Sequence, residues 1–127
     1  MKKLFNSNCK KIAIAEDNIF FRDVCIKVIE QSGEYRVDIR ACNGLELIME
    51  MHKQEVDAVI IDIKMPIMNG TDTIQHIQQN YKKTKIIVYS TYYSEDVRKQ
   101  YLSKGIDAYL CKEQSFDNLI NTLAELL

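Results

Sequence analysis

Short apolar runs recur along the chain and are separated by stretches of mixed polarity. Five of these runs predict β-strands, at residues 11–15, 35–41, 58–61, 85–90 and 108–111. The run at 58–61, Ala-Val-Ile-Ile between two aspartates, is apolar throughout and indicates a strand buried on both faces, as in a parallel sheet covered by helices. The run at 35–41 alternates apolar and polar residues instead, which is typical of an edge strand.

Apolar residues at helical spacing follow each of these runs. They predict helices over residues 18–31, 45–53, 71–81, 94–105 and 114–127. Asn18 and Ser94 are suited to cap two of these helices at their starts. Because strand and helix alternate five times, with connections long enough for right-handed crossovers, we predict an α/β, flavodoxin-like fold. This fold is a doubly wound sheet of five parallel strands in the order 2-1-3-4-5, with five helices on its two faces.

Length and composition fit one globular domain. The chain has 127 residues, of which 46% are hydrophobic and 28% charged, enough to build a single core. We expect a polar N-terminal arm at residues 1–10 and one domain at residues 11–127. With 17 basic and 18 acidic residues, the net charge of -1 provides no electrostatic footprint for nucleic acid or an anionic membrane. No stretch predicts a membrane span or a signal peptide, so a cytoplasmic location is expected.

The four cysteines predict neither a zinc site nor a disulfide framework. Their spacing contains no C-x-x-C pair, and the two histidines lie apart from them in the sequence. We therefore expect reduced cysteines that pack as small hydrophobic residues.

Polar residues follow the carboxyl ends of the predicted strands. Asp62 ends the run at 58–61, and Pro66 then forces the chain to turn away, which leaves the Asp62 carboxylate at the rim of the sheet. Four more polar residues stand at strand ends: Glu16, Asp17, Ser90 and Lys112. Each alone has a structural explanation, as a strand end, a helix cap or a surface lysine. Their shared position at the rim where open α/β sheets bind ligands favours a functional site.

Three carboxylates at one rim need a cation. Asp62 ends the third strand, Glu16 and Asp17 end the first, and these strands are neighbours in the predicted order. Like charges so close repel and raise one another's pKa, a conflict that Mg²⁺ resolves. With Lys112 as a second positive charge and Ser90 as a hydroxyl donor, the site predicts a pocket for a phosphoryl group on Asp62. The carboxylate attacks, the metal neutralises charge on the transferring oxygens, and lysine and serine hold the product.

These residues resemble the receiver domain of two-component response regulators, from Lys11 to Leu127. The features that match are the pair Glu16-Asp17, the block Asp62-Ile-Lys-Met-Pro-Ile-Met-Asn-Gly70, the hydroxyl of Ser90, and Ala108-Tyr-Leu-Cys-Lys112 with Gly105 before it. The segment from Gly105 to Glu113 is similar to receivers of the NarL/FixJ kind, which precede helix-turn-helix DNA-binding domains.

The resemblance implies a role for each residue at the rim. Asp62 is the phosphoacceptor, and it binds Mg²⁺ directly together with Asp17 and the backbone carbonyl of Lys64. Glu16 assists through water, and Lys112 bridges the phosphoryl group to the acidic pair.

A switch is implied as well. Ser90 is the switch hydroxyl, and Tyr109 is the switch aromatic, which is expected to rotate inward when Ser90 moves.

The implied function is that of a phosphoprotein rather than an enzyme. The chain takes a phosphoryl group from a histidine kinase or phosphotransfer protein and catalyses at most its own phosphorylation and dephosphorylation. Phosphorylation then changes the surface of the fourth helix, fifth strand and fifth helix. We expect this surface to control transcription through a DNA-binding output domain beyond this chain, which we take to be cut from a longer regulator, and a homodimer on activation is one further option. No membrane partner is expected.

Two residues depart from the family's pattern, and two others border the pocket. Glu113 follows Lys112 where many receivers have proline, and we expect it to compete for the lysine. Ser90 replaces the commoner threonine, which is conservative because either hydroxyl can donate. Lys64 and Tyr92 are expected to slow the attack of water on the phosphoaspartate.

Two other classes of protein deserve comparison. A haloacid-dehalogenase-like phosphohydrolase also uses an aspartate nucleophile with Mg²⁺, but by resemblance it needs a second acid two residues on, where Lys64 stands. The alternative that stays open is a receiver-like protein-interaction module that is regulated without phosphorylation. Failure to bind Mg²⁺ would favour that alternative.

Overall fold

Five parallel strands form one sheet in the order β2-β1-β3-β4-β5. The computed structural model describes residues 5–127, so residues 1–4 of the predicted arm lie outside the described residues. The strands are β1 (Lys10–Ala15), β2 (Tyr35–Ala41), β3 (Ala58–Ile61), β4 (Lys85–Ser90) and β5 (Ala108–Cys111). The predicted strand order and the edge position of β2 are confirmed. β1 begins one residue before the predicted start, because Lys10 pairs with Tyr35.

The five helices begin at side-chain caps. They are α1 (Ile19–Glu30), α2 (Gly44–Met51), α3 (Gly70–Asn80), α4 (Glu95–Ser103) and α5 (Phe116–Leu126). Their N-cap residues, Asn18, Asn43, Asn69, Ser94 and Ser115, each accept a hydrogen bond from a backbone N–H of the first turn. Such caps satisfy donors that have no partner within the helix, which fixes where each helix starts.

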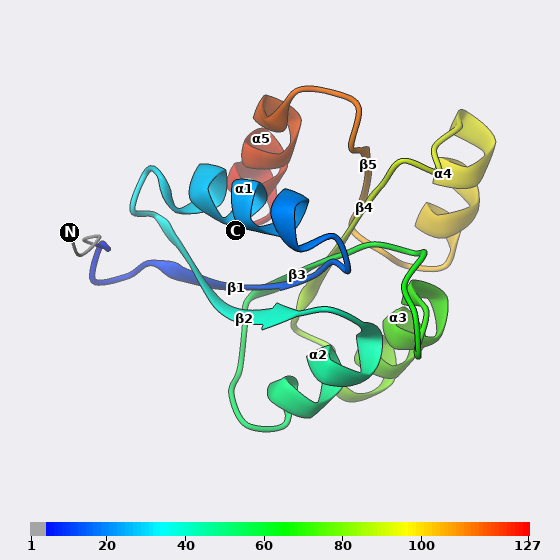
Figure 1. The fold of residues 1–127 in the computed structure, drawn as a ribbon, viewed down its shortest axis with the longest axis horizontal. Helices are drawn as coiled ribbons and strands as arrows, with labels where there is room; N and C mark the ends of the chain where they lie inside the picture. The colour runs from blue at the N-terminus through cyan, green and yellow to red at the C-terminus, as the bar shows by residue number, and fades with distance from the viewer. Residues whose placement is uncertain (1–4) are drawn as a thin grey trace.

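The helices cover both faces of the sheet. Figure 1 shows α1 and α5 on one side and α2 and α3 on the other, with α4 beside β4 and β5. β3 is buried on both faces, as predicted: Val59 and Ile61 pack towards α2 and α3, while Ala58 and Ile60 pack towards α1 and α5. The carboxyl ends of all five strands therefore meet at one edge of a rigid, two-sided core. No helix in the described part of the chain is both long and apolar enough to cross a membrane.

Candidate functional site

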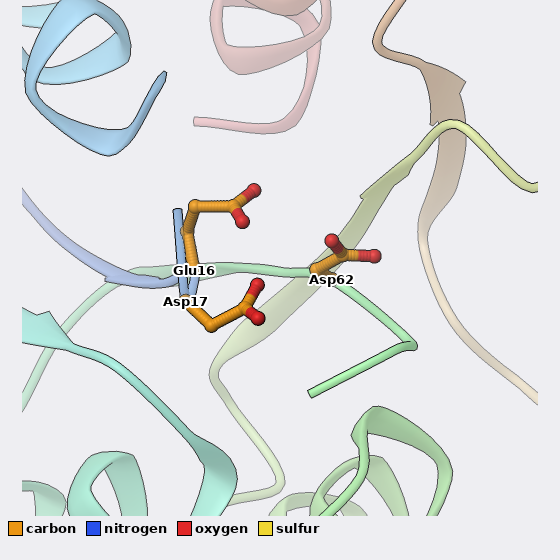
Figure 2. A group of neighbouring side chains, drawn as sticks. All are labelled: Glu16, Asp17 and Asp62. Carbon is orange, nitrogen blue, oxygen red and sulfur yellow. The ribbon is translucent and has the colours of Figure 1, made fainter. Parts of the chain in front are cut away.

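Three carboxylates meet at the carboxyl edge of the sheet. Figure 2 shows Glu16 and Asp17, which follow β1, beside Asp62, which follows β3. Ala15 pairs with Ile61 across the two strands, and the Asp62 N–H donates to the Ala15 carbonyl over 3.2 Å. The register therefore places the residues after the two strands next to each other. Carboxylate oxygens of the three side chains lie within 4.8 Å of one another.

The three acids differ in exposure. Glu16 and Asp62 are 3% and 8% exposed, whereas Asp17 faces solvent. Burial raises the pKa of Glu16, and the hydrogen bonds from Lys112 and from the Asn18 N–H oppose that rise. The Asn18 N–H donates to Glu16 Oε2 over 3.0 Å, so the loop after β1 holds this carboxylate in one orientation.

Lys112 bridges two of the acids. Its Nζ donates to Asp62 Oδ2 over 2.6 Å and also to Glu16 Oε1. Burial lowers the pKa of Lys112, but the bonds to Asp62 and Glu16 outweigh it, and the net direction is upward. Lys112 is therefore an ammonium at neutral pH. Glu113, which was expected to compete for this lysine, is exposed, and Lys112 pairs with the two rim acids instead.

The donor set at this edge fits Mg²⁺. Three carboxylates offer hard oxygen ligands within the span of one small cation. The loop after β3 folds back over Asp62, because the Gly70 N–H donates to the Ile63 carbonyl over 2.8 Å. A Cβ at Gly70 would meet the Asp62 carbonyl oxygen and would lie 2.6 Å from Ile63 Cα, so glycine permits this close approach. The loop thus keeps Lys64, next along the chain, beside the acids.

Ser90 and Tyr109 lie on the opposite side of Asp62 from the acidic pair. Ser90 ends β4, is buried, and accepts a hydrogen bond at Oγ from the Tyr92 N–H over 3.0 Å. Tyr109 packs between Tyr93 and Tyr101, with ring centroids 5.8 and 5.4 Å away, and donates its hydroxyl to the Tyr92 carbonyl. Burial raises the pKa of Tyr109 to about 12, so its hydroxyl stays a neutral donor.

Tyr109 lies inward in this structure and is 2% exposed. Its role as the switch aromatic stays a prediction. The neighbouring tyrosine rings supply a ready-made aromatic pocket, and this is the physical reason that the inward position is stable.

Two contacts at the site were not predicted. Lys112 Nζ lies 4.9 Å from the centroid of the Phe21 ring, and Lys64 Nζ lies 4.9 Å from that of Tyr92. Tyr92 and Lys64 had been assigned to the border of the pocket, but not to each other. Phe21 was predicted only as part of the helix at 18–31, because helical spacing cannot show which ring a distant lysine will contact.

The chain belongs to the response regulator receiver domain family, whose model matches residues 12–124. It is 28% identical over 123 residues to the transcriptional regulatory protein DegU of Brevibacillus brevis, covering 97% of this chain and 52% of that protein. It is 26% identical to the chemotaxis protein CheY of Halobacterium salinarum, over 93% of this chain and 97% of that protein. The chain thus spans about half the length of DegU and nearly all of CheY.

Solved structures of response regulators share this architecture. A LuxR-family DNA-binding response regulator from Staphylococcus aureus superposes with a TM-score of 0.84 at 26% identity, covering 92% of this chain and 98% of that one. The response regulator TrrA from Thermotoga maritima, solved in complex with Mg²⁺ and BeF, gives a TM-score of 0.80 at 30% identity, covering 93% and 99%. The predicted family and fold are therefore confirmed.

Proposed function

We propose that Asp62 accepts a phosphoryl group from a histidine kinase or a phosphotransfer protein. The observation that carries this proposal is the position of the Lys112 ammonium, which bonds to Asp62 and Glu16 beside three clustered carboxylates. A lysine that bonds to a buried carboxylate within a cluster of acids suits a covalent phosphoryl intermediate better than a passive strand end, and Ser90 ends the neighbouring strand β4.

The transfer is a direct displacement at phosphorus. An Asp62 carboxylate oxygen attacks, the phosphorus–nitrogen bond of the donor's phosphohistidine breaks, and the released imidazole takes a proton from solvent. Lys112 then exchanges its bond to the Asp62 oxygen for one to a phosphoryl oxygen, and Ser90 donates its hydroxyl to another. Asp17, Asp62 and the Lys64 carbonyl, with Glu16 through water, would hold Mg²⁺, which neutralises charge on the transferring oxygens.

The phosphorylated state differs from the free state in charge. A phosphoryl group on Asp62 adds roughly two negative charges and attracts Ser90 and Lys112. Ser90 would act as the switch hydroxyl and Tyr109 as the switch aromatic, and the backbone of Tyr92 couples the two because it bonds to both side chains. The surface that responds is formed by α4, β5 and α5, and phosphorylation shifts the balance between two packings of it.

We propose that the chain from β1 to α5 forms a cytoplasmic receiver domain. This domain catalyses at most its own phosphorylation and dephosphorylation. Similarity to DegU and to a LuxR-family regulator supports control of transcription through a DNA-binding output domain, with homodimer formation on activation as one route.

Intact-protein mass after incubation with acetyl phosphate tests the proposal. We expect a single phosphoryl adduct that requires Mg²⁺ and is absent from Asp62→Asn. The control is Asp57→Asn, at the other end of β3, which should retain the adduct. An adduct in Asp62→Asn would move the phosphoacceptor elsewhere. No adduct in the wild type, together with no Mg²⁺ binding by titration, would favour the phosphorylation-independent interaction module.

A further inference from the structure

Among the residues that the structure describes, the ammonium of Lys112 contacts two acids and one aromatic ring. The ring is that of Phe21, and Nζ lies over its face, 4.9 Å from the ring centroid. The Lys112 side chain is 12% exposed, so water contributes little to solvating this charge. A cation over an aromatic face gains most from the ring when it is withdrawn from water in this way.

Phe21 is tied to the acidic pair through its own backbone. The Phe21 N–H donates to Asn18 Oδ1 over 3.0 Å, and the Asn18 N–H donates to Glu16 Oε2 over 3.0 Å. Glu16 in turn accepts from Lys112. The contacts therefore close a ring from Glu16 through Asn18 and Phe21 to Lys112 and back, so the cap of α1 fixes the aromatic face relative to the carboxylate.

The Phe21 ring is also supported from behind. It stacks on Phe116 of α5, with centroids 6.0 Å apart and planes at 29°, and it lies 5.8 Å from the ring of Tyr89 in β4. Rings from α5 and β4 thus hold Phe21 in place on α1. Within the described residues, neither of these two rings contacts Lys112. The Phe21 ring is therefore a fixed support rather than a mobile surface side chain.

We propose that Phe21 is a positioning residue for Lys112 in phosphoryl transfer. This inference rests on the proposed function of Asp62. During transfer Lys112 must leave the Asp62 oxygen and reach a phosphoryl oxygen. A ring face holds a cation without a directional hydrogen bond, so the ammonium keeps this contact while it exchanges oxygens. Phe21 thereby keeps the charge desolvated and aimed at the phosphoryl group throughout the step.

Three substitutions in the full chain separate positioning from packing. Phe21→Leu keeps an apolar side chain but removes the ring face, and we expect Mg²⁺-dependent phosphorylation by acetyl phosphate to slow about 3- to 30-fold. Phe21→Trp restores an aromatic face and should recover most of the rate. Phe116→Leu is the matched control: leucine still packs behind Phe21, and the ring that faces Lys112 is kept, so the rate should stay near that of the wild type.

The geometry is tested without phosphorylation by NMR of the metal-free protein. The Cε protons of Lys112 should be shifted upfield by the Phe21 ring, remain so in Phe116→Leu, and return to ordinary lysine positions in Phe21→Leu. The proposal would be overturned if the Lys112 protons of the wild type had ordinary chemical shifts. It would also be overturned if phosphorylation slowed equally in Phe21→Leu and Phe116→Leu, or if Phe21→Leu kept the wild-type rate. If the wild type forms no adduct, the function of Asp62 fails instead, while the proton shifts still report on the contact.

Discussion

Lys112 neutralises charge at the rim, and its geometry defines what a phosphoryl group must displace. The ammonium bonds to Asp62 and Glu16, while Asp17 remains exposed. Asp62 is thus partly occupied before any donor arrives, and Asp17 is the acid with room for further ligands. Removing the partner of a buried charge strongly lowers stability. We therefore expect the loss of Lys112, or of either acid that it contacts, to destabilise the whole group.

The contact between Lys64 and Tyr92 leads to a prediction on the phosphoryl lifetime. The Lys64 ammonium lies over the Tyr92 ring, and both side chains are exposed beside Asp62. We predict that this pair restricts the approach of water, so that Lys64→Ala should speed hydrolysis of the phosphoaspartate about threefold or more. The measurement is the decay of the phosphoryl adduct by intact mass after acetyl phosphate is removed.

A second lysine provides the control for that measurement. Lys104 lies 4.8 Å from the centroid of the Tyr101 ring, in the same kind of contact on α4. Lys104→Ala should leave the decay unchanged. An unchanged decay in Lys64→Ala as well would contradict a shielding role.

Two buried tyrosines allow a matched test of stability. In the described residues the Tyr89 hydroxyl is buried without a hydrogen-bond partner, whereas the Tyr109 hydroxyl donates to the Tyr92 carbonyl. Removing an unsatisfied buried hydroxyl relieves a desolvation cost, while removing a satisfied one leaves its acceptor unpaired. We expect Tyr89→Phe to raise the free energy of unfolding by up to about 1 kcal/mol and Tyr109→Phe to lower it by about 1 kcal/mol. Urea unfolding followed by circular dichroism measures both, and a loss of stability in Tyr89→Phe would point to a buried water on that hydroxyl.

The bounds of the elements were predicted correctly where residues at the ends of the element mark them. β2, β4 and β5 have their predicted bounds, because each is an apolar or alternating run with a clear stop. Helix starts were predicted where a capping side chain precedes the apolar spacing, as at Asn18 and Ser94, but α3 begins at Gly70 after Asn69 rather than at Thr71. Here the glycine was assigned to the loop, because propensity alone disfavours it in a helix.

Contacts between elements could not be predicted from the sequence. Leu45 stands at an apolar position of α2 yet is 46% exposed, and α4 has no fully buried side chain. The converging acids could be inferred from strand order, because strand ends must share an edge. The aromatic contacts around Lys112 and Tyr109 could not be inferred in this way, because they depend on how helices pack against each other.

The loop between β3 and α3 gives a prediction at the scale of elements. A Cβ at Gly70 would meet backbone atoms of Asp62 and Ile63, which cannot move aside as a side chain would. Gly70→Ala should therefore lower stability by about 1–3 kcal/mol and slow phosphorylation, because the loop shifts away from Asp62.

Gly33→Ala is the control: Gly33 has a φ of 78° at the other end of the sheet. It should lose stability by about 1 kcal/mol or more yet phosphorylate at the wild-type rate. Equal rates in the two variants would show that the loop tolerates the shift.

The whole molecule combines an apolar core with one edge at which charges are concentrated. Both faces of the sheet are filled by apolar side chains, whereas the carboxyl edge holds three acids against one lysine. We expect such an arrangement to lower the stability of the metal-free protein and to favour the binding of cations. We therefore expect the clustered acids to lower stability while they serve the proposed function, and both effects can be measured.

Thermal unfolding with and without Mg²⁺ measures how far the ion stabilises the folded protein. An ion that binds only the folded state stabilises it by mass action, so Mg²⁺ at a hundred times its Kd should add about 2.7 kcal/mol, or roughly 10 °C in Tm. Asp17→Asn removes one of the repelling charges and one proposed ligand. We expect the metal-free variant to be more stable than the metal-free wild type and to gain little from Mg²⁺. Asp23→Asn, on the exposed surface of α1, is the control and should respond like the wild type. If the wild type itself gained nothing from Mg²⁺, the edge would be an acidic surface without a metal, and the interaction module would become the better account of this receiver fold.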